Sequence, residues 1–407
     1  MARGTRIAVV GLGTAGSSAA LLLSRAGFRV TLFEKVEEPR AIGAGIMLQV
    51  TGLSVLRELG LEGRILDQGA RIERLRVETT KGKSVLQLDY RRLREGLFGL
   101  GIHRGVLFDT LYKEVLGSEI ELRLGVEIVR ARHRDTGELD LLDRSGTSWG
   151  PFDLVVVSDG ARSLVRTQSP AFSERTTKYP WGALWFVAED PEGTFRNELF
   201  QRVEGTRGMV GILPTGLDPN GKRVVSLFVS VCLEELPLLR SRGIEALRQD
   251  ILRISPAAES LLPQLDSFEE LRVAEYFDVS MPRWHAPGIV AIGDAAHATS
   301  PQLGQGANLA LIDAKVLADC LRGDPNVEGA IRRYSILRTD HLDYYQFATR
   351  LLTPFFQSNF APLGLLRDWA MPVALKVPYA EREMIRTMSG TKTGYFSGDL
   401  FDGVNPQ

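Results

Sequence analysis

The sequence predicts an α/β protein in which one unit is assembled from separated segments and a second, strand-rich unit is inserted between them. Three observations indicate this arrangement. The chain opens with a strand, a glycine-rich turn, a helix and a second strand within residues 6–34. Two later apolar runs, residues 152–157 and 289–292, are typical of buried strands in a parallel sheet. Between these runs, residues 179–232 are mostly strand-like, with glycines at the expected turns.

The opening segment is the clearest part of the pattern. Residues 6–10 form a short β-rich apolar run that leads directly into Gly11-Leu12-Gly13-Thr14-Ala15-Gly16. Residues 17–25 are rich in Ala and Leu, which predicts a helix. Residues 29–33 predict the second strand, and Glu34 follows it directly.

The other elements follow from the same periodicities. Helices are predicted at residues 52–61, 106–115, 243–262 and 306–321. Residues 72–88 predict a hairpin with its tip at Lys81-Gly82-Lys83, and residues 120–143 predict several short strands. The chain beyond residue 326 is expected to be helical and irregular.

Composition narrows the class of protein. A length of 407 residues is too great for one ordinary core, so two or more units are expected. The 49 basic and 50 acidic residues nearly cancel, which argues against nucleic acid or an anionic membrane as a partner. Cys232 and Cys320 lie far apart, which favours neither disulfides nor a cysteine metal site and suggests a cytoplasmic location. We expect no signal peptide and no transmembrane segment.

The glycine turn predicts a dinucleotide site. Pyrophosphate oxygens need close backbone approach and the positive end of a helix. Gly11 makes the tight turn, Gly13 leaves room for the phosphate, and Gly16 lets the helix pack on the strand. Glu34 stands where an acid accepts hydrogen bonds from ribose hydroxyls. The alternative is an ordinary glycine-rich turn beside a surface glutamate, and the motif alone does not separate FAD from NAD(P).

Three further segments bear on that choice. Residues 158–166 read SDGARSLVR, residues 292–297 read IGDAAH after a buried strand, and residues 301–308 read PQLGQGAN at the start of a helix. With the N-terminal turn, these segments resemble the class A flavoprotein monooxygenases, the aromatic-hydroxylase group. The resemblance covers residues 6–321, with the motifs in the family's order.

The resemblance implies an FAD-binding Rossmann-like domain of the glutathione-reductase type. This domain would be interleaved with a mostly antiparallel substrate-binding sheet and followed by a C-terminal helical region. The implied FAD domain comprises residues 1–71, 100–178 and 277–325. The implied sheet domain comprises residues 72–99 and 179–276, and the helical segment residues 326–407.

The resemblance also assigns roles toward a tight, non-covalent FAD. Asp294 would hydrogen-bond ribityl or ribose hydroxyls, and Asp159 with Gly160 would serve both the pyrophosphate region and the nicotinamide cofactor. Arg104 would contact FAD from a helix start, Arg40 would lie near the phosphates, and Val126 would contact adenine through its backbone. Ser158 differs from the small apolar residue usual in the family. The full set of expected FAD-binding residues is Gly11, Gly13, Ala15, Gly16, Glu34, Lys35, Arg40, Arg104, Val126, Asp159, Asp294, Gly304, Gly306, Ala307 and Asn308.

The helix that begins after Gly304 can also be interpreted physically. Its free N–H groups and positive end would face whatever lies before it. If that is the pyrimidine edge of a flavin, these donors stabilise the negative charge of the reduced ring. The alternative is a glycine-rich loop that starts an ordinary helix.

The implied activity is that of a single-component monooxygenase. The chain holds only one G-x-G-x-x-G turn, so NADPH or NADH is expected to bind transiently at the FAD domain. Hydride would reduce FAD, and a flavin C4a-hydroperoxide would transfer one atom of O2 to a hydrophobic aromatic or heteroaromatic, phenol-like substrate.

The substrate pocket is expected between the inserted sheet and the flavin. Each candidate for its wall is also compatible with a plain core position: Gln49, Trp185, Phe200, Met209, Leu213, Pro214 and Phe228. No catalytic base is identified, and His297 is expected to pack beside its turn. The histidines show no metal-type spacing. The apolar run at residues 351–356 covers the pocket, forms a dimer contact or completes the core, and the protein is expected to be a monomer or homodimer.

Two other functions use the same features. A flavin-dependent reductase or halogenase would share the scaffold, although the W-x-W-x-I-P halogenase signature is absent from the sequence. A non-catalytic, FAD-stabilised interaction module is the second alternative. The glycine turn at residues 304–308 argues against the latter, because a scaffold would not need those donors.

Overall fold

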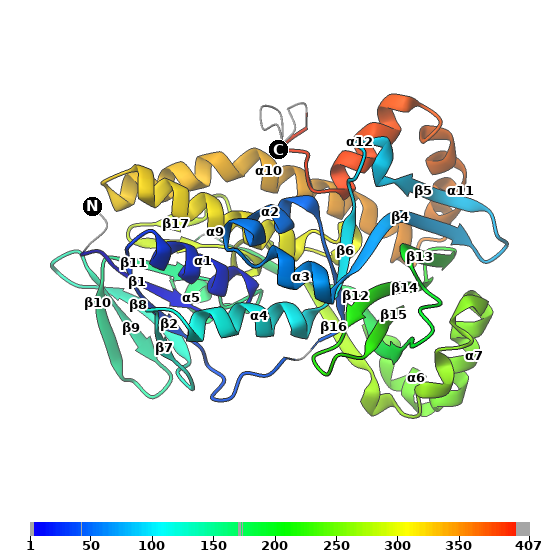
Figure 1. Cartoon of the computed structure of the whole chain (residues 1–407), viewed down its shortest axis with the longest axis horizontal. Coiled ribbons are helices and arrows are strands. Elements are labelled where there is room, and N and C mark those ends of the chain that lie inside the picture. Colours follow the sequence, from blue (N-terminus) through cyan, green and yellow to red (C-terminus); the bar gives the residue numbers. More distant parts are fainter. Residues whose placement is uncertain (1–3, 42, 170–171, 173, 396–407) are drawn as a thin grey trace.

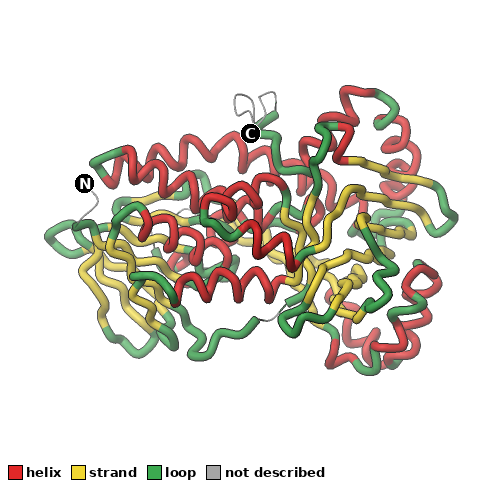
Figure 2. Tube along the Cα trace, in the orientation of Figure 1, coloured by secondary structure: helices red, strands yellow, loops and turns green. Residues whose placement is uncertain are grey.

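The computed structural model describes residues 4–41, 43–169, 172 and 174–395. The molecule is elongated, with a six-stranded and a three-stranded sheet towards one end and a nine-stranded sheet towards the other (Figure 1). The long helix α10 (Val327–Phe356) runs beside both parts along the upper edge of this view. Figure 2 shows the helices gathered over the six-stranded sheet and at the outer ends of the nine-stranded sheet.

The six-stranded sheet carries the N-terminal unit. Strand β1 lies between β2 and β11, and both neighbours are parallel to it. All four residues of β11 are buried, as expected where helices cover both faces of a parallel sheet. The strands, in spatial order, are β17 (His285–Ala286), β18 (Ile289–Ala291), β11 (Leu154–Val157), β1 (Arg6–Val10), β2 (Arg29–Phe33) and β7 (Glu121–Arg123).

Three helices pack together on this sheet. Helix α1 (Thr14–Arg25) contacts both α9 (Gly306–Gly323) and α4 (Arg104–Leu116). Ala19 and Ala20 of α1 are fully buried. Their small side chains let the helix axes approach closely, so the first turns of α1 and α9 lie near each other.

The three-stranded antiparallel sheet is attached through aromatic contacts. It consists of β8 (Ile128–His133), β9 (Leu139–Asp143) and β10 (Ser148–Phe152). Phe33, at the end of β2, meets Trp149 and Phe152 edge to face, with ring centroids 5.6 and 6.0 Å apart. Such contacts stabilise the protein beyond the buried area of the rings, and they hold the three-stranded sheet beside the six-stranded one.

The nine-stranded sheet is mostly antiparallel, and the pair β13–β4 is parallel. Its spatial order is β16-β12-β15-β14-β13-β4-β6-β3, with β5 paired to β4. The strands are β3 (Gly45–Leu48), β4 (Ala70–Thr79), β5 (Ser84–Asp89), β6 (Gly99–His103), β12 (Arg175–Glu189), β13 (Asn197–Glu204), β14 (Gly208–Leu217), β15 (Arg223–Cys232) and β16 (Arg272–Ser280).

The two faces of this sheet pack against different helices. Ile212 and Leu227, which pair directly, belong to an apolar cluster with α7 (Ile244–Ile254), near α6 (Leu236–Ser241). Met209 and Leu213 belong to a separate cluster that includes Phe356 of α10. Because side chains alternate along a strand, β14 and β15 each contribute to both clusters.

The C-terminal helices complete the second cluster. Phe356 is buried there, Leu352 and Phe355 pack against it, and Leu351 is exposed. Of the three expectations for residues 351–356, these contacts fit completion of the core, and a cover over the pocket and a dimer contact stay predictions. Helices α11 (Pro362–Ala374) and α12 (Pro378–Met388) follow, beside β5.

The predicted fold class is confirmed, with local differences. The helix expected over residues 243–262 ends at Ile254, because Pro256 lacks an N–H and disfavours helical geometry at Ser255. The chain beyond residue 326 forms α10, a helix of 30 residues, followed by α11 and α12, and is more regular than expected. The other helices near the N-terminal sheet are α2 (Val50–Glu58) and α3 (Glu62–Gln68).

The proposed domain boundaries stay a prediction. Strand β3 and most of β6 lie within the proposed FAD segments, yet both belong to the nine-stranded sheet. The polypeptide therefore passes between the two sheets at these strands.

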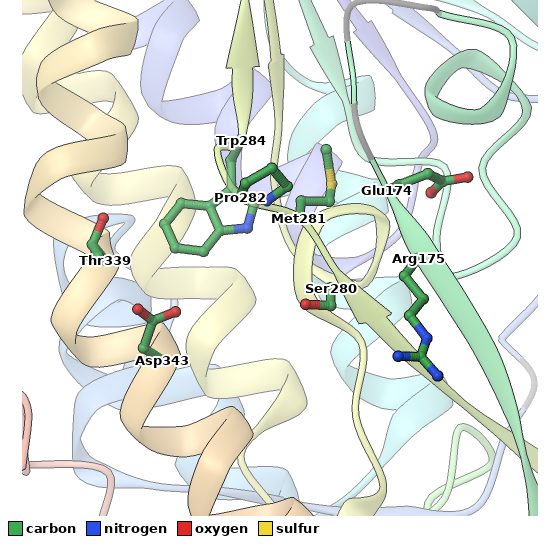
Figure 3. Close-up of a pocket in the computed structure, with 8 residues that line it drawn as sticks. All are labelled: Glu174, Arg175, Ser280, Met281, Pro282, Trp284, Thr339 and Asp343. Atoms are coloured by element: carbon green, nitrogen blue, oxygen red, sulfur yellow. The ribbon is translucent and has the colours of Figure 1, made fainter.

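Two surface cavities lie where β12 and β16 meet α10. The first, of about 450 Å³, has Trp284 and Met281 on one side and Thr339 and Asp343 of α10 on the other (Figure 3). The second, of about 540 Å³, shares Arg175 and Ser280 with it. Neither includes a residue expected to form the substrate pocket.

Candidate functional site

The glycine turn between β1 and α1 has the shape that a pyrophosphate requires. A Cβ on Gly16 would lie 1.8 Å from the carbonyl oxygen of Gly11, and one on Gly11 would lie 2.6 Å from that of Ser158. Gly11 also has φ +105°, which favours glycine. A Cβ on Gly13 would meet no protein atom within 4 Å. The turn therefore closes tightly around two glycines and leaves space beside the third.

Glu34 holds this turn from the end of β2. Its Oε2 accepts a hydrogen bond from the N–H of Leu12 at 2.9 Å, and its Oε1 accepts one from the N–H of Val36 at 3.0 Å. A carboxylate oxygen can accept more than one hydrogen bond. Glu34 can therefore order the turn and still accept from a ribose hydroxyl, the role that the sequence predicts.

The 158–160 segment packs directly behind the turn. The Ser158 hydroxyl donates to the carbonyl of Val10 at 2.7 Å, which joins β11 to β1 and accounts for a serine at this family position. Asp159 Oδ2 accepts from the N–H of Leu164, at the start of α5 (Leu164–Thr167). Its Oδ1 is buried and has no hydrogen-bond partner among the described residues. Burial raises the pKa of Asp159. Because Oδ1 has no partner among these residues, it can accept from a further donor.

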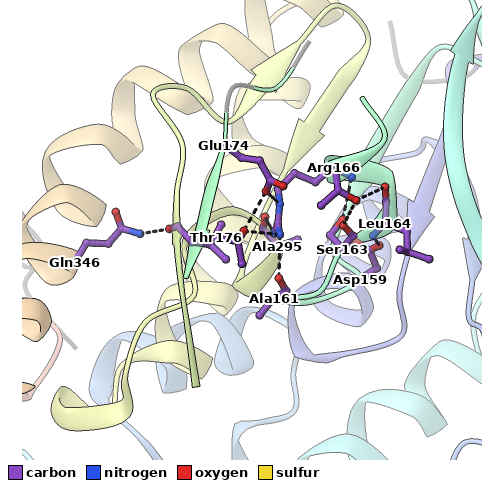
Figure 4. Close-up of polar contacts among 11 residues, drawn as sticks. Asp159, Ala161, Ser163, Leu164, Arg166, Glu174, Thr176, Ala295 and Gln346 are labelled. Atoms are coloured by element: carbon purple, nitrogen blue, oxygen red, sulfur yellow. Dashed lines mark hydrogen bonds and ion pairs between the residues drawn. The ribbon is translucent and has the colours of Figure 1, made fainter. Parts of the chain in front are cut away.

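Arg166 joins this segment to the second acidic motif. Its side chain is about 1% exposed and donates to the carbonyls of Ala295 at 2.6 Å and Ala161 at 2.9 Å (Figure 4). It also bonds the Thr176 hydroxyl at 3.1 Å and forms an ion pair with Glu174. A guanidinium presents five donors in one plane, so one side chain fixes α5, α8 (Asp294–His297) and the start of β12 together.

Gly293 and Asp294 lie beside the first turns of two helices. A Cβ on Gly293 would be 2.8 Å from the Cβ of Ala15 in α1. A Cβ on Gly306, the first residue of α9, would be 3.9 Å from Asp294 Oδ1. Asp294 is exposed. The structure therefore brings the predicted residues of the glycine turn, the acidic motif and the α9 start into one row.

A buried charged network supports this row from behind. Asp313 Oδ2 accepts from the N–H of Gly293 at 2.8 Å and bonds His297 Nε2 at 2.5 Å. Asp313 Oδ1 accepts from Arg338 Nε at 2.7 Å, and Arg338 bonds His341. Burial alone would raise the pKa of Asp313, but the neighbouring His297 and Arg338 hold that pKa well below its usual range. His297 thus packs beside the turn, as expected.

The start of α9 faces β3. The first N–H groups of a helix, here including those of Gly306 and Ala307, have no intrahelical acceptor. Within the described chain, no side chain caps this helix. The Asn308 side chain accepts from the N–H of Gln49 at 2.7 Å and donates to the carbonyl of Met47 at 3.1 Å. Asn308 therefore holds the end of β3 against the open helix end.

The remaining predicted FAD residues lie at the rim of this row. Arg40 is exposed and ion-paired with Glu38 at 2.9 Å, and Lys35 is exposed after β2. Arg104 begins α4, and a Cβ on Gly43 would lie 2.8 Å from its Cβ. Val126 donates its N–H to the carbonyl of Glu34 at 2.9 Å. Their roles toward FAD stay predictions.

Four of the predicted pocket residues share one face of the nine-stranded sheet. Trp185 pairs with Phe228, and their ring centroids are 4.8 Å apart. A Cβ on Gly211 would be 2.0 Å from Cζ of Phe228, so the tip of that ring lies over the glycine. Met209 and Leu213 belong to the same apolar cluster. We call Trp185, Met209, Leu213 and Phe228 the apolar wall.

Phe200 and Pro214 are not brought to this wall. Phe200 pairs with Ile212 and Pro214 with Val225, and both partners belong to the cluster on the other face. The Phe200 ring lies between the guanidiniums of Arg76 and Arg202, at 4.2 and 5.9 Å from the centroid. The alternation of side chains along β13 and β14 explains the separation.

The sequence patterns do not predict a role for the supporting residues Asp313, Arg338 and Arg166. One signal was present, because Asp313 interrupts the apolar run LALIDAKVL in residues 309–317. A charge on the buried side of a helix is retained only where it is paired.

Comparison with known proteins agrees with this geometry. The family model described as "FAD binding domain" matches residues 4–335. A putative FAD-dependent monooxygenase of Bacillus subtilis is 28% identical over 337 residues, covering 80% of this chain and 87% of the relative. The 3-amino-4-hydroxybenzoate 2-monooxygenase of Streptomyces cremeus is 29% identical over 392 residues, covering 91% and 92%. HpxO of Klebsiella pneumoniae, solved with FAD and uric acid, superposes with TM-score 0.80 at 20% identity, covering 95% of this chain and 98% of HpxO.

The fold and the row of motifs define an FAD-binding flavoprotein. The chain belongs to the FAD-binding-domain family of class A flavoprotein monooxygenases, and it is an FAD-dependent monooxygenase. No helix of the described residues is long and apolar enough to cross a membrane. Those residues also contain no group of His, Cys, Asp or Glu suited to a metal ion.

The residues present fit FAD. The open space beside Gly13 suits a pyrophosphate, and the unpartnered Asp159 Oδ1 and exposed Asp294 offer acceptors for hydroxyl groups. The uncapped start of α9 offers donors.

Proposed function

We propose that this FAD-dependent monooxygenase hydroxylates a hydrophobic aromatic or heteroaromatic substrate with an electron-rich, phenol-like ring, and that NADPH or NADH is the reductant. The observation that carries the proposal is the apolar wall. Its aromatic and aliphatic side chains lie on the sheet face that also holds Met47 of β3. The Asn308 side chain of α9 donates to the Met47 carbonyl, so this face adjoins the start of α9.

Each part of the site has a role in this reaction. When bound, FAD supplies the redox chemistry, taking hydride from the nicotinamide and activating O2 for transfer to the ring. The free N–H groups at the start of α9 stabilise negative charge that develops beside them. The apolar wall and the cover formed by Phe355 and Phe356 exclude water from the reacting ring. No described side chain is assigned as a base.

The names of the relatives support the substrate class. The Streptomyces cremeus enzyme is named for 3-amino-4-hydroxybenzoate, and HpxO was solved with uric acid. Both compounds are electron-rich rings. An activated oxygen that attacks as an electrophile would require such a ring.

The experiment is a turnover assay on the purified holoenzyme. NADH or NADPH oxidation and O2 consumption are followed with a panel of phenols, hydroxybenzoates and heteroaromatics. The proposal predicts that at least one compound accelerates both rates and yields an oxygenated product. If the nicotinamide is oxidised without any oxygenated product, the enzyme is a reductase instead. If a substrate is halogenated when halide is supplied, it is a halogenase instead. A flavin that neither nicotinamide reduces with any compound would refute it.

A further inference from the structure

The Gln49 side chain holds a hydrogen-bond donor that no described residue uses. Gln49 is about 1% exposed and is the N-cap residue of α2, directly after β3. Its Oε1 accepts from the Tyr90 hydroxyl at 3.0 Å. Its Nε2 is buried and has no hydrogen-bond partner within the described part of the chain. An unpaired buried donor is costly and calls for an explanation.

The orientation of this amide is fixed. The Gln49 backbone N–H is held by Asn308 Oδ1 at 2.7 Å, and the side-chain oxygen is held by Tyr90. Tyr90 is itself about 1% exposed, and burial raises the pKa of its hydroxyl, which therefore stays protonated and donates. With the oxygen engaged by Tyr90, the Nε2 hydrogens point elsewhere.

Strand β6 shows where this amide lies relative to the apolar wall. A Cβ on Gly99 would be 3.3 Å from Gln49 Oε1 and 3.4 Å from the Tyr90 hydroxyl. A Cβ on Gly101 would be 3.2 Å from Leu213 Cδ1. Residues two apart in a strand face the same side, so the Gln49 amide and Leu213 lie over one glycine-lined stretch of β6.

Apolar residues surround this stretch. Met47, Tyr90, Leu213 and Phe228 belong to one buried cluster, and Trp185 packs against it. A lone oriented donor in an apolar surface is the arrangement by which binding sites fix the orientation of a ligand.

We propose that Gln49 is a specificity-determining residue whose Nε2 donates a hydrogen bond to an acceptor on the substrate, and that Tyr90 is the positioning residue that orients its amide. The inference rests on the proposed function and narrows its substrate class. The substrate is an aromatic compound that carries a carbonyl or a similar acceptor beside the ring, since a purely hydrocarbon substituent leaves the donor unpaired.

The test uses ligand binding to the holoenzyme, followed by the change in flavin absorbance without any nicotinamide. Matched pairs differ only in the acceptor: 4-hydroxyacetophenone with 4-ethylphenol, 2-hydroxybenzaldehyde with 2-methylphenol, and indole-3-carboxaldehyde with 3-methylindole. In at least one pair, the wild type should bind the carbonyl compound about tenfold more tightly. Gln49→Met, which keeps length and loses the amide, should bring the ratio of the two Kd values near one.

Tyr90→Phe is the second variant, because it removes one hydroxyl and preserves the ring that packs in the core. Tyr90→Phe should lower the ratio of the two Kd values only partially, since the Gln49 amide is then free to rotate. Thermal unfolding and FAD content check that both variants are folded.

The outcomes are distinguishable. Equal Kd values within every pair for the wild type, or a ratio unchanged in Gln49→Met, would overturn the inference and leave the proposed function intact. A variant that loses FAD affinity while keeping the ligand ratio would also overturn it, because Nε2 would then serve the cofactor. If no aromatic compound perturbs the flavin, the proposed function fails and the inference fails with it.

Discussion

Asp313 of α9 accepts a hydrogen bond from the backbone N–H of Gly293 at 2.8 Å. The carboxylate is fully buried and is held in turn by Arg338 of α10 and by His297. Gly293 lies against the first turn of α1 and precedes the exposed Asp294. The buried Asp313 carboxylate therefore positions the Gly293-Asp294 motif at the cofactor site, although Asp313 itself does not reach that site.

Asp313→Asn tests this relationship. The amide keeps an acceptor but leaves Arg338 as an uncompensated buried charge, which costs about 3–5 kcal/mol. We expect the free energy of unfolding in urea to fall by that order and FAD to bind more weakly. Asp319→Asn is the matched control on the same helix, because Asp319 is partly exposed in surface ion pairs and should change stability by less than about 1 kcal/mol. Equal effects of the two variants would contradict the account.

His341 makes the stability of the protein depend on pH. Burial, reinforced by the Arg338 charge, holds its pKa well below the usual range. The folded protein keeps the imidazole neutral, whereas the unfolded chain takes up a proton below about pH 6.5. The free energy of unfolding therefore falls as the pH is lowered, by about 1 kcal/mol from this residue between pH 7 and 5.5. Asp313, whose pKa is depressed, stays ionised over this range.

Urea unfolding at both pH values measures that change. Burial also lowers the pKa of His103, so the wild type carries further dependence of the same sign. His341→Gln should retain the pH dependence of stability that comes from His103 and lose the dependence that comes from His341. A variant with the same slope as the wild type would show that the pKa of His341 is not lowered in the folded state.

A substitution at Gly13 should change the affinity for FAD without changing the stability of the fold. An alanine there would meet no protein atom, and the backbone has φ −72°, so we expect Gly13→Ala to fold with normal stability. If pyrophosphate occupies that space, the methyl group should raise the Kd for FAD by about tenfold or more, because overpacking costs about 1–3 kcal/mol. Fluorescence titration of the apoprotein with FAD measures this.

Gly63→Ala is the control for that experiment. Gly63 lies in α3, and its Cβ would likewise meet no atom within 4 Å. It should leave FAD affinity unchanged and stabilise the protein by up to about 1 kcal/mol, since alanine favours the helix. Unaltered FAD binding in Gly13→Ala would place the pyrophosphate elsewhere.

Much of the fold could be predicted from the sequence because its signals are local. The turn at Gly11 to Gly16 and the buried run of β11 each specify their own geometry within a few residues. The apolar pattern predicts too late an end for α7, because it continues beyond Pro256, which marks the true end.

The rest of the site depends on contacts between distant residues. Asp313 and Arg338 are 25 positions apart, and Gln49 and Asn308 are 259 positions apart. Strand register also decides which wall candidates meet. Phe200 and Pro214 have the same apolar character as Leu213, but they face the opposite side, and composition alone does not reveal it.

The most direct measurement of the central claim is the origin of the oxygen atom in the product. The holoenzyme is supplied with NADPH or NADH, an aromatic compound that accelerates turnover, and ¹⁸O2, and the product mass is determined. The account predicts that the product gains one atom of ¹⁸O, and that the same reaction in H2¹⁸O under ordinary O2 incorporates none at the new hydroxyl. A product oxygen that comes from water, or a product without added oxygen, would contradict it.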